Sequence, residues 1–237
     1  PVGVLKMSET ESFLAKRCTF VANTVNGIGG AGDFDQMNKM YVPNCSFINN
    51  TALRHAGAIS IKHTFLVVLD QNVFINQESG LLGGVLYAID TKLFSSKNDM
   101  FRTNKADIGG SCYISGSKSD SFGNFLYTIM EENTAVQHGG SLSIQNLRNI
   151  TIEKCILINN TVEDGEGGAV YLLVIVKVEI LSSNFGNNAA NNLHGGAMCL
   201  AHSEMVLFLN SSFIENFAGE RGTSLILSDI SQTSLYH

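Results

Sequence analysis

The side chains best suited to redox or metal chemistry are five cysteines and six histidines. No two of them have the Cys-x-x-Cys or His-x-x-x-His spacing of a zinc site, and no acidic stretch has the spacing of a calcium-binding loop. His138 and His194 each stand immediately before two glycines, where we expect exposed corner residues. The sequence therefore predicts no metal site and no cofactor.

Catalytic motifs are lacking as well. The sequence has no serine nucleophile elbow and no glycine-rich loop that leads into a helix. A polysaccharide-cleaving site needs clustered carboxylates, or a carboxylate near an arginine, on one outer face. The outward row of the strands inferred below has no such cluster, but it places Tyr87 and Tyr113 in neighbouring repeats, where they stack on a sugar or on each other. We predict a protein that is not an enzyme, with a glycan-binding or polysaccharide-degrading β-helix as the alternative.

Asn-x-Ser/Thr sequons mark candidate N-glycosylation sites. Asn49 and Asn159 precede a repeated amide position, and we expect them to face solvent. A glycosylated chain would be secreted or displayed on a cell surface. The candidate sites are Asn44, Asn49, Asn149, Asn159 and Asn210.

These residues belong to a repeat that occurs eight times. Its reference residue, aromatic or long and aliphatic, recurs at steps of 27 to 29 residues, and such a period is typical of a solenoid. The eight reference residues are Phe20, Phe47, Phe74, Phe101, Met130, Leu157, Phe185 and Phe213.

A side-chain amide follows each reference residue after three positions. Amides both donate and accept hydrogen bonds, so amides in successive coils can bond to one another and to the backbone at a tight corner. Asn also adopts the left-handed conformation that such corners require. We predict a structural amide ladder of Asn23, Asn50, Gln77, Asn104, Asn133, Asn160, Asn188 and Asn216.

Apolar residues alternate after a glycine pair in most repeats, as in Leu142 and Ile144 after Gly139-Gly140. This period of two indicates a strand with one buried face. In the second repeat we expect strands at 58–61, 65–69 and 72–75. We predict an all-β, right-handed parallel β-helix of about eight coils, with ~27 residues and three short strands per coil.

Two segments depart from this pattern. Residues 32–42 contain Asp33, Asp35 and Gln36 where a clean strand is expected, and we predict a protruding loop or a distorted coil there. Residues 115–124 are polar, rich in turn formers, and carry the extra residues of the 29-residue step. We expect them to bulge from the solenoid, as a specificity loop or as a tolerated insertion.

Cys18 and Cys45 share one repeat position in neighbouring coils, about 4.8 Å apart by stacking. That spacing permits a disulfide. Parallel neighbours point their Cβ atoms alike, however, which favours a stacked pair of buried thiols. Both states stay open, with the disulfide as the less favoured one.

Composition bounds the remaining possibilities. The 237 residues, 44% hydrophobic with 23 Gly and 2 Pro, favour a single β-helix domain over residues 1–237. The net charge is −6 without a basic block, so nucleic acid is not an expected partner. The longest apolar run, residues 171–181, is too short to span a bilayer.

Both ends fall in the middle of a repeat, and we expect a segment of a longer solenoid whose membrane attachment comes only through segments outside this chain.

The pairing of Phe-x-x-Asn with Gly-Gly-Ala in one repeat resembles the chlamydial polymorphic outer-membrane protein family, and similar repeats occur in surface or secreted proteins of ciliates and other protists. Examples are Phe47-Ile48-Asn49-Asn50 and Gly167-Gly168-Ala169-Val170. The resemblance covers essentially the whole chain and implies a β-helical surface domain that acts in adhesion. We expect a non-catalytic structural or adhesive scaffold, extracellular or on a cell surface, that binds other proteins, a cell surface, neighbouring copies or the rest of its own solenoid.

Overall fold

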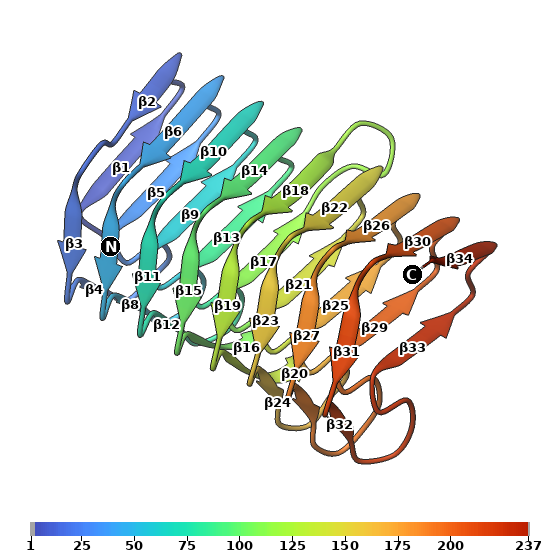
Figure 1. Ribbon diagram of the computed structural model, residues 1–237. Helices are drawn as coiled ribbons and strands as arrows, with labels where there is room; N and C mark the ends of the chain where they lie inside the picture. The colour runs from blue at the N-terminus through green and yellow to red at the C-terminus, as the bar shows by residue number, and fades with distance from the viewer. Residues whose placement is uncertain (1–2, 237) are drawn as a thin grey trace.

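The computed structural model describes residues 3–236, which form a parallel β-helix without any helical segment. Strands that are neighbours in a sheet belong to successive coils, so the chain advances steadily from one end of the rod to the other (Figure 1). The predicted fold is confirmed, with about nine turns of ~27 residues each.

The first two sheets have nine strands each. The first sheet consists of β1 (Leu5–Ser8), β5 (Gly32–Asp35), β9 (Ile59–Lys62), β13 (Leu86–Ile89), β17 (Cys112–Ser115), β21 (Leu142–Gln145), β25 (Val170–Leu173), β29 (Met198–Ala201) and β33 (Leu225–Ser228). The second sheet consists of β2 (Ser12–Leu14), β6 (Lys39–Pro43), β10 (Leu66–Asp70), β14 (Leu93–Lys97), β18 (Phe122–Leu126), β22 (Asn149–Glu153), β26 (Lys177–Leu181), β30 (Met205–Leu209) and β34 (Gln232–Tyr236).

The other two sheets have eight strands each. The third sheet consists of β3 (Thr19–Val21), β7 (Ser46–Ile48), β11 (Val73–Ile75), β15 (Met100–Arg102), β19 (Ile129–Glu131), β23 (Ile156–Ile158), β27 (Asn184–Gly186) and β31 (Ser212–Ile214). The fourth sheet consists of β4 (Thr24–Val25), β8 (Thr51–Ala52), β12 (Glu78–Ser79), β16 (Lys105–Ile108), β20 (Thr134–His138), β24 (Thr161–Val162), β28 (Ala189–Ala190) and β32 (Phe217–Ala218).

Each complete coil thus contains four strands, and the prediction of three was wrong. The strands of the fourth sheet follow the repeated amide directly, and most have only two residues, as β12 does. Two residues are too few to show the alternation by which a strand is identified in a sequence. In the sequence, these short strands therefore look like part of a corner.

Residues 32–42 form regular strands, so the predicted loop or distorted coil was also wrong. Asp33 and Asp35 take the outward positions of β5, while Phe34 points inwards and is 2% exposed. The acidic residues therefore preserve the alternation of the strand.

The predicted bulge lies within residues 116–121, between β17 and β18, and is the long green loop of Figure 1. Lys118 Nζ lies 3.3 Å from Glu204 Oε1, three coils further along the rod. The loop therefore leans over neighbouring coils.

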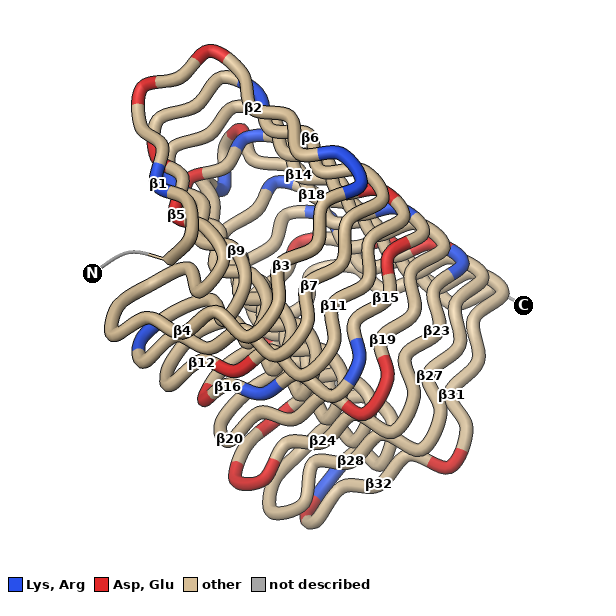
Figure 2. Tube along the Cα trace, turned by 90° about the vertical axis from the view of Figure 1, so that its left-hand side faces the viewer, with Lys and Arg blue, Asp and Glu red and all other residues tan. Residues whose placement is uncertain are grey.

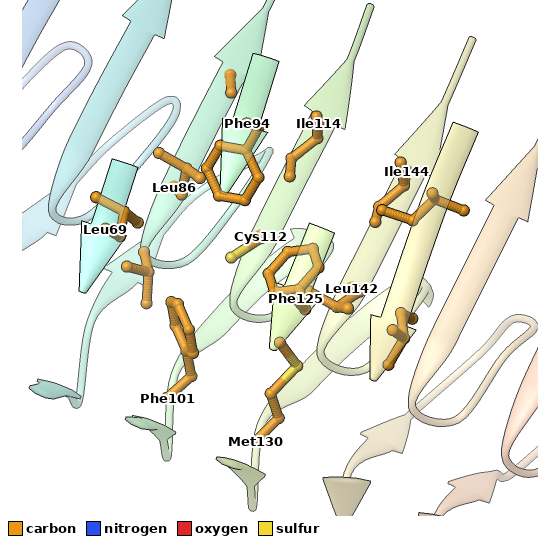
Figure 3. Packing of buried hydrophobic residues seen from close by; sticks show 14 of the residues in the cluster. Leu69, Leu86, Phe94, Phe101, Cys112, Ile114, Phe125, Met130, Leu142 and Ile144 are labelled. Atoms are coloured by element: carbon orange, nitrogen blue, oxygen red, sulfur yellow. The ribbon is translucent and has the colours of Figure 1, made fainter. Parts of the chain in front are cut away.

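The core is one continuous column of inward side chains along the rod, part of which is shown in Figure 3. Reference residues stack ring on ring: the centroids of Phe20, Phe47, Phe74 and Phe101 follow one another at 4.8–4.9 Å. That distance equals the spacing of strands in a sheet. Side-chain stacking and backbone hydrogen bonding therefore enforce the same repeat.

Almost every corner of a coil is turned by one residue with positive φ. Before the first sheet this residue is usually a glycine, and at the other corners it is usually not. At the amide corner it is the residue before the amide, such as Asn49 with φ 56°. The left-handed residue therefore precedes the ladder amide, whose own side chain turns into the coil.

We expect Gly140→Ala to reduce the free energy of unfolding by about 3 kcal/mol. A Cβ at Gly140 would lie 2.1 Å from Gly168 O and 2.7 Å from Thr161 N, inside the backbone of the next coil. Gly186→Ala is the matched control, because the nearest atom to its Cβ would be Ile158 Cγ2 at 3.5 Å. Urea unfolding of both variants measures the difference, and equal effects would contradict this account.

Candidate functional site

The eight predicted amides lie above one another in the corner between the third and fourth sheets, and most are buried. Asn50 Oδ1 accepts hydrogen bonds from Asn23 N at 3.0 Å and Asn23 Nδ2 at 2.7 Å. Asn50 Nδ2 donates to Gln77 Oε1 at 2.9 Å and to Phe20 O at 3.0 Å. One amide thus links three coils. Gln77 bonds to Asn104 Oδ1 through its backbone N, and contacts between side-chain amides continue from Asn104 to Asn216. The ladder is structural and holds the coils in register.

A second polar ladder stands in the corner between the second and third sheets. Cysteines mark this repeat position in the sequence, and its other members are also small and polar. Asp99 Oδ1 accepts from Asn72 N at 2.7 Å and from Asn72 Nδ2 at 2.9 Å, and Ser96 Oγ donates to Asp99 Oδ2 at 2.6 Å. Burial raises the pKa of Asp99 to about 7, although the hydrogen bonds from Ser96 and Asn72 act in the opposite direction and lower it. The members are Cys18, Cys45, Asn72, Asp99, Thr128, Cys155, Ser183 and Ser211.

All five cysteines are free thiols. Cys45 Sγ accepts a hydrogen bond from Cys18 N at 3.3 Å and lies 3.3 Å from Ala15 O. This is the stacked-thiol arrangement, in which Cys45 occupies a place in the second ladder. Burial raises the pKa values of Cys155 and Cys199 to about 12, so these two thiols are poor nucleophiles at neutral pH.

Four of the five sequon asparagines are exposed: Asn44, Asn49, Asn159 and Asn210. Each has positive φ at a corner that borders the third sheet. Asn149 is half-buried and opens β22. The four corner sites are therefore open to a glycan.

Aromatic rings stack along the outer side of the first sheet. The ring centroid of Tyr87 lies 4.6 Å from that of His55 and 5.9 Å from that of Tyr113, with nearly parallel planes. Both faces of Tyr87 are therefore covered by protein rings, and its edge is what remains for a ligand.

The histidines beside the glycine pairs are half-buried, so the prediction of exposed corner residues was wrong. His138 stacks on Tyr171 with centroids 4.4 Å apart, and burial lowers its pKa. The Nδ1 atoms of His138 and His194 are buried without a hydrogen-bond partner. Among residues 3–236, no three His, Cys, Asp or Glu side chains are placed to share a metal ion.

The outer side of the third sheet, here named the aliphatic face, carries a run of aliphatic side chains with few charges. Each strand of this sheet has an inward middle residue, buried in all strands but the terminal β3 and β31, and two outward neighbours, as in β7, β11 and β23. Ile156 is 40% exposed and Ile214 is 53% exposed. The apolar outward residues are Val21, Ile48, Val73, Ile75, Met100, Ile129, Ile156, Ile158 and Ile214.

Charge is nearly absent from the aliphatic face. Within its strands the charged residues are Arg102 and Glu131, and Figure 2 shows these strands largely in tan. Arg102 Nε lies 3.6 Å from Glu131 Oε2 and 3.6 Å from Glu132 Oε2. Exposed corner residues, many of them asparagines, border both sides of the face. A largely apolar strip with one charged pair, bordered by polar corners, is typical of protein-binding surfaces.

The other faces differ. The outward row of the fourth sheet is largely polar, with Thr24, Thr51, Glu78, Lys105, Thr134 and Thr161. The second sheet mixes exposed apolar residues such as Leu93 and Phe122 with charged ones such as Lys97. The aliphatic face was not predicted from the sequence, where its signal is the apolar residues that flank the reference residue in most of these strands.

No protein-family model, curated protein or solved structure matches the chain. The resemblance to polymorphic outer-membrane protein repeats accordingly rests on the repeat motifs. The described residues also contain no helix that is long and apolar enough to cross a membrane.

We expect Asp99→Asn to stabilise the protein at neutral pH. The Asp99 pKa is raised from 3.8 to about 7 in the folded chain, so its contribution to stability is complete below about pH 4 and is lost as the pH rises through 7. One pKa unit corresponds to about 1.4 kcal/mol, so the loss is at most about 4 kcal/mol. An asparagine keeps the hydrogen bond from Asn72 and stays neutral.

Urea unfolding of the wild type and Asp99→Asn between pH 4 and 8 tests this, because the difference between the two should grow with pH and level off above about pH 7. Glu163→Gln, at an exposed position, is the control and should run parallel to the wild type. If the stability difference between Asp99→Asn and the wild type stays constant with pH, ionisation of the Asp99 carboxyl is not what destabilises the wild type.

Proposed function

We propose that the chain is a non-catalytic, adhesive β-helix scaffold of a cell surface or of the extracellular space, and that it binds protein partners laterally. The observation that carries this proposal is the aliphatic face. Its centre, formed by Val73, Ile75, Met100, Ile129 and Ile156, is contiguous across four coils. Ile156 is exposed and the other four are half-buried, so together they form a continuous, partly exposed apolar strip. Such strips mark interaction sites.

The rigidity of the rod supports a scaffold role. Both ladders and the stacked rings bind each coil to its neighbours, so the face keeps its shape without a partner. A preformed surface loses little conformational entropy on binding. Affinity then depends on the side chains that the face presents.

An extracellular location is supported by the sequons. Asn44, Asn49, Asn159 and Asn210 are exposed at corners, where a glycan would meet no packed neighbour. We propose these four, and the half-buried Asn149 less favourably, as N-glycosylation sites of the chain in a eukaryotic secretory pathway.

Adhesion of chain-coated beads to a panel of animal, protist and bacterial cells tests the proposed function. We expect attachment to at least one cell type, and a reduction of at least tenfold by the double substitution Ile129→Lys and Ile156→Lys, because two ammonium groups would occupy the apolar centre of the face. These residues are register partners in β19 and β23.

The matched control is Thr134→Lys with Thr161→Lys, register partners on the outward row of the fourth sheet in the same two coils. It adds the same charge elsewhere and should change attachment less than twofold. Attachment to no cell type, or an equal loss in both double variants, would refute adhesion through the aliphatic face.

A further inference from the structure

The aliphatic face is chemically symmetric about its middle. The boundary between β15 and β19 has four third-sheet strands on either side. At equal distances from this boundary, Arg102 corresponds to Glu131 and Ile75 corresponds to Ile158. A positive charge is thus matched by a negative one, and an aliphatic residue by an aliphatic residue.

The remaining outward positions continue this symmetry. Apolar residues correspond to apolar ones, polar to polar, and one large side chain to a glycine. The pairs are Met100 with Ile129, Val73 with Ile156, Ser46 with Asn184, Thr19 with Ser212, Val21 with Ile214, and Ile48 with Gly186.

We infer that the partner of the aliphatic face is a second copy of this chain, packed face to face with the two rods antiparallel. The inference rests on the proposed function, since it uses the same face. The two-fold axis lies between the two sheets, runs along the strand direction, and passes between β15 and β19. This axis reverses the direction of the rod but keeps the direction of the strands. Each outward residue therefore faces the residue at the same strand position in the partner's coil that lies equally far from the axis on the other side.

Charge selects this arrangement among the alternatives. Arg102 of each copy faces the partner's Glu131, so two ion pairs form at the centre. An axis through β15 would oppose two arginines, and an axis through β19 would oppose two glutamates. An axis parallel to the rod would set Arg102 against the partner's Met100. Of these four arrangements, the antiparallel one about the middle alone sets Arg102 and Glu131 each against an opposite charge.

The size of the face suits a weak dimer. Eight strands stacked at ~4.8 Å extend over ~38 Å, and strands of three residues are about 10 Å wide. The flat area is therefore roughly 400 Å² per copy, the size of a weak, transient interface. We expect a dissociation constant in the high micromolar range.

Charge reversal tests the pairing in chain produced without N-glycans, because Asn49 and Asn159 lie at the rim. Sedimentation equilibrium should show a monomer–dimer equilibrium for the wild type. Arg102→Glu alone and Glu131→Arg alone should each weaken it at least tenfold, and the double variant should restore it to within about threefold. Lys105→Glu, a reversal on the fourth sheet in the coil of Arg102, should have no effect.

Cross-linking tests the antiparallel geometry. Ile75→Cys and Ile158→Cys chains should cross-link to each other through a maleimide reagent that spans about 10 Å, the separation of packed sheets. Neither variant alone should cross-link above the background of the wild type, whose own thiols are mostly buried. Cross-linking of Ile75→Cys with itself would indicate another arrangement and overturn the inference.

A chain that stays monomeric at all concentrations, or a folded double variant that stays monomeric, would overturn the inference. Thermal unfolding establishes that each variant is folded. Failure here is separable from failure of the proposed function: a monomeric chain whose beads still attach to cells through the aliphatic face has a different partner.

Discussion

The whole structure depends on hydrogen bonds between a coil and its two neighbours. The backbone bonds of the corners and strand ends run almost entirely between coils, as from Leu142 N to Ala169 O. The buried amides bond mainly between coils as well: Asn133 Nδ2 donates to Asn160 Oδ1 at 3.0 Å, and its contact within its own coil, to Ser141 Oγ, is longer at 3.5 Å. Most buried polar groups of the corners therefore depend on a matching group about one repeat away. The repeat length is a condition of hydrogen bonding and not only of core packing.

This constraint divides the residues of a coil into two groups. Inward residues and corner residues must fit the coils above and below, so extra residues such as 116–121 are extruded. Outward residues face solvent and can change without disturbing the stack. The ladders and glycine corners therefore say little about what the protein does, and the outer rows, where the four sheets differ from one another, carry the functional information.

The sequence predicted those parts of the fold that recur with the repeat. The amide at Asn50, the glycines at Gly139 and Gly140, and the alternation at Leu142 and Ile144 predicted a stacked β-helix because each is needed in nearly every coil. Features without a period of two, such as the strand at Glu78–Ser79, could not be identified. The exposure of His138 was misjudged because it depends on Tyr171 of the following coil. Side chains that pack across coils become neighbours only when the register is known.

The aliphatic face shows how the register turns composition into an argument about function. Stacked Ile and Val favour a strand, but threonines in the fourth sheet meet the same β-branched preference without exposing as much apolar surface. Strand formation alone therefore does not explain Ile129 and Ile156. The Arg102–Glu131 pair joins two neighbouring coils, but a partly exposed ion pair adds little stability to a monomer. Both features are accounted for together by a surface that covers the face and meets each charge with its opposite.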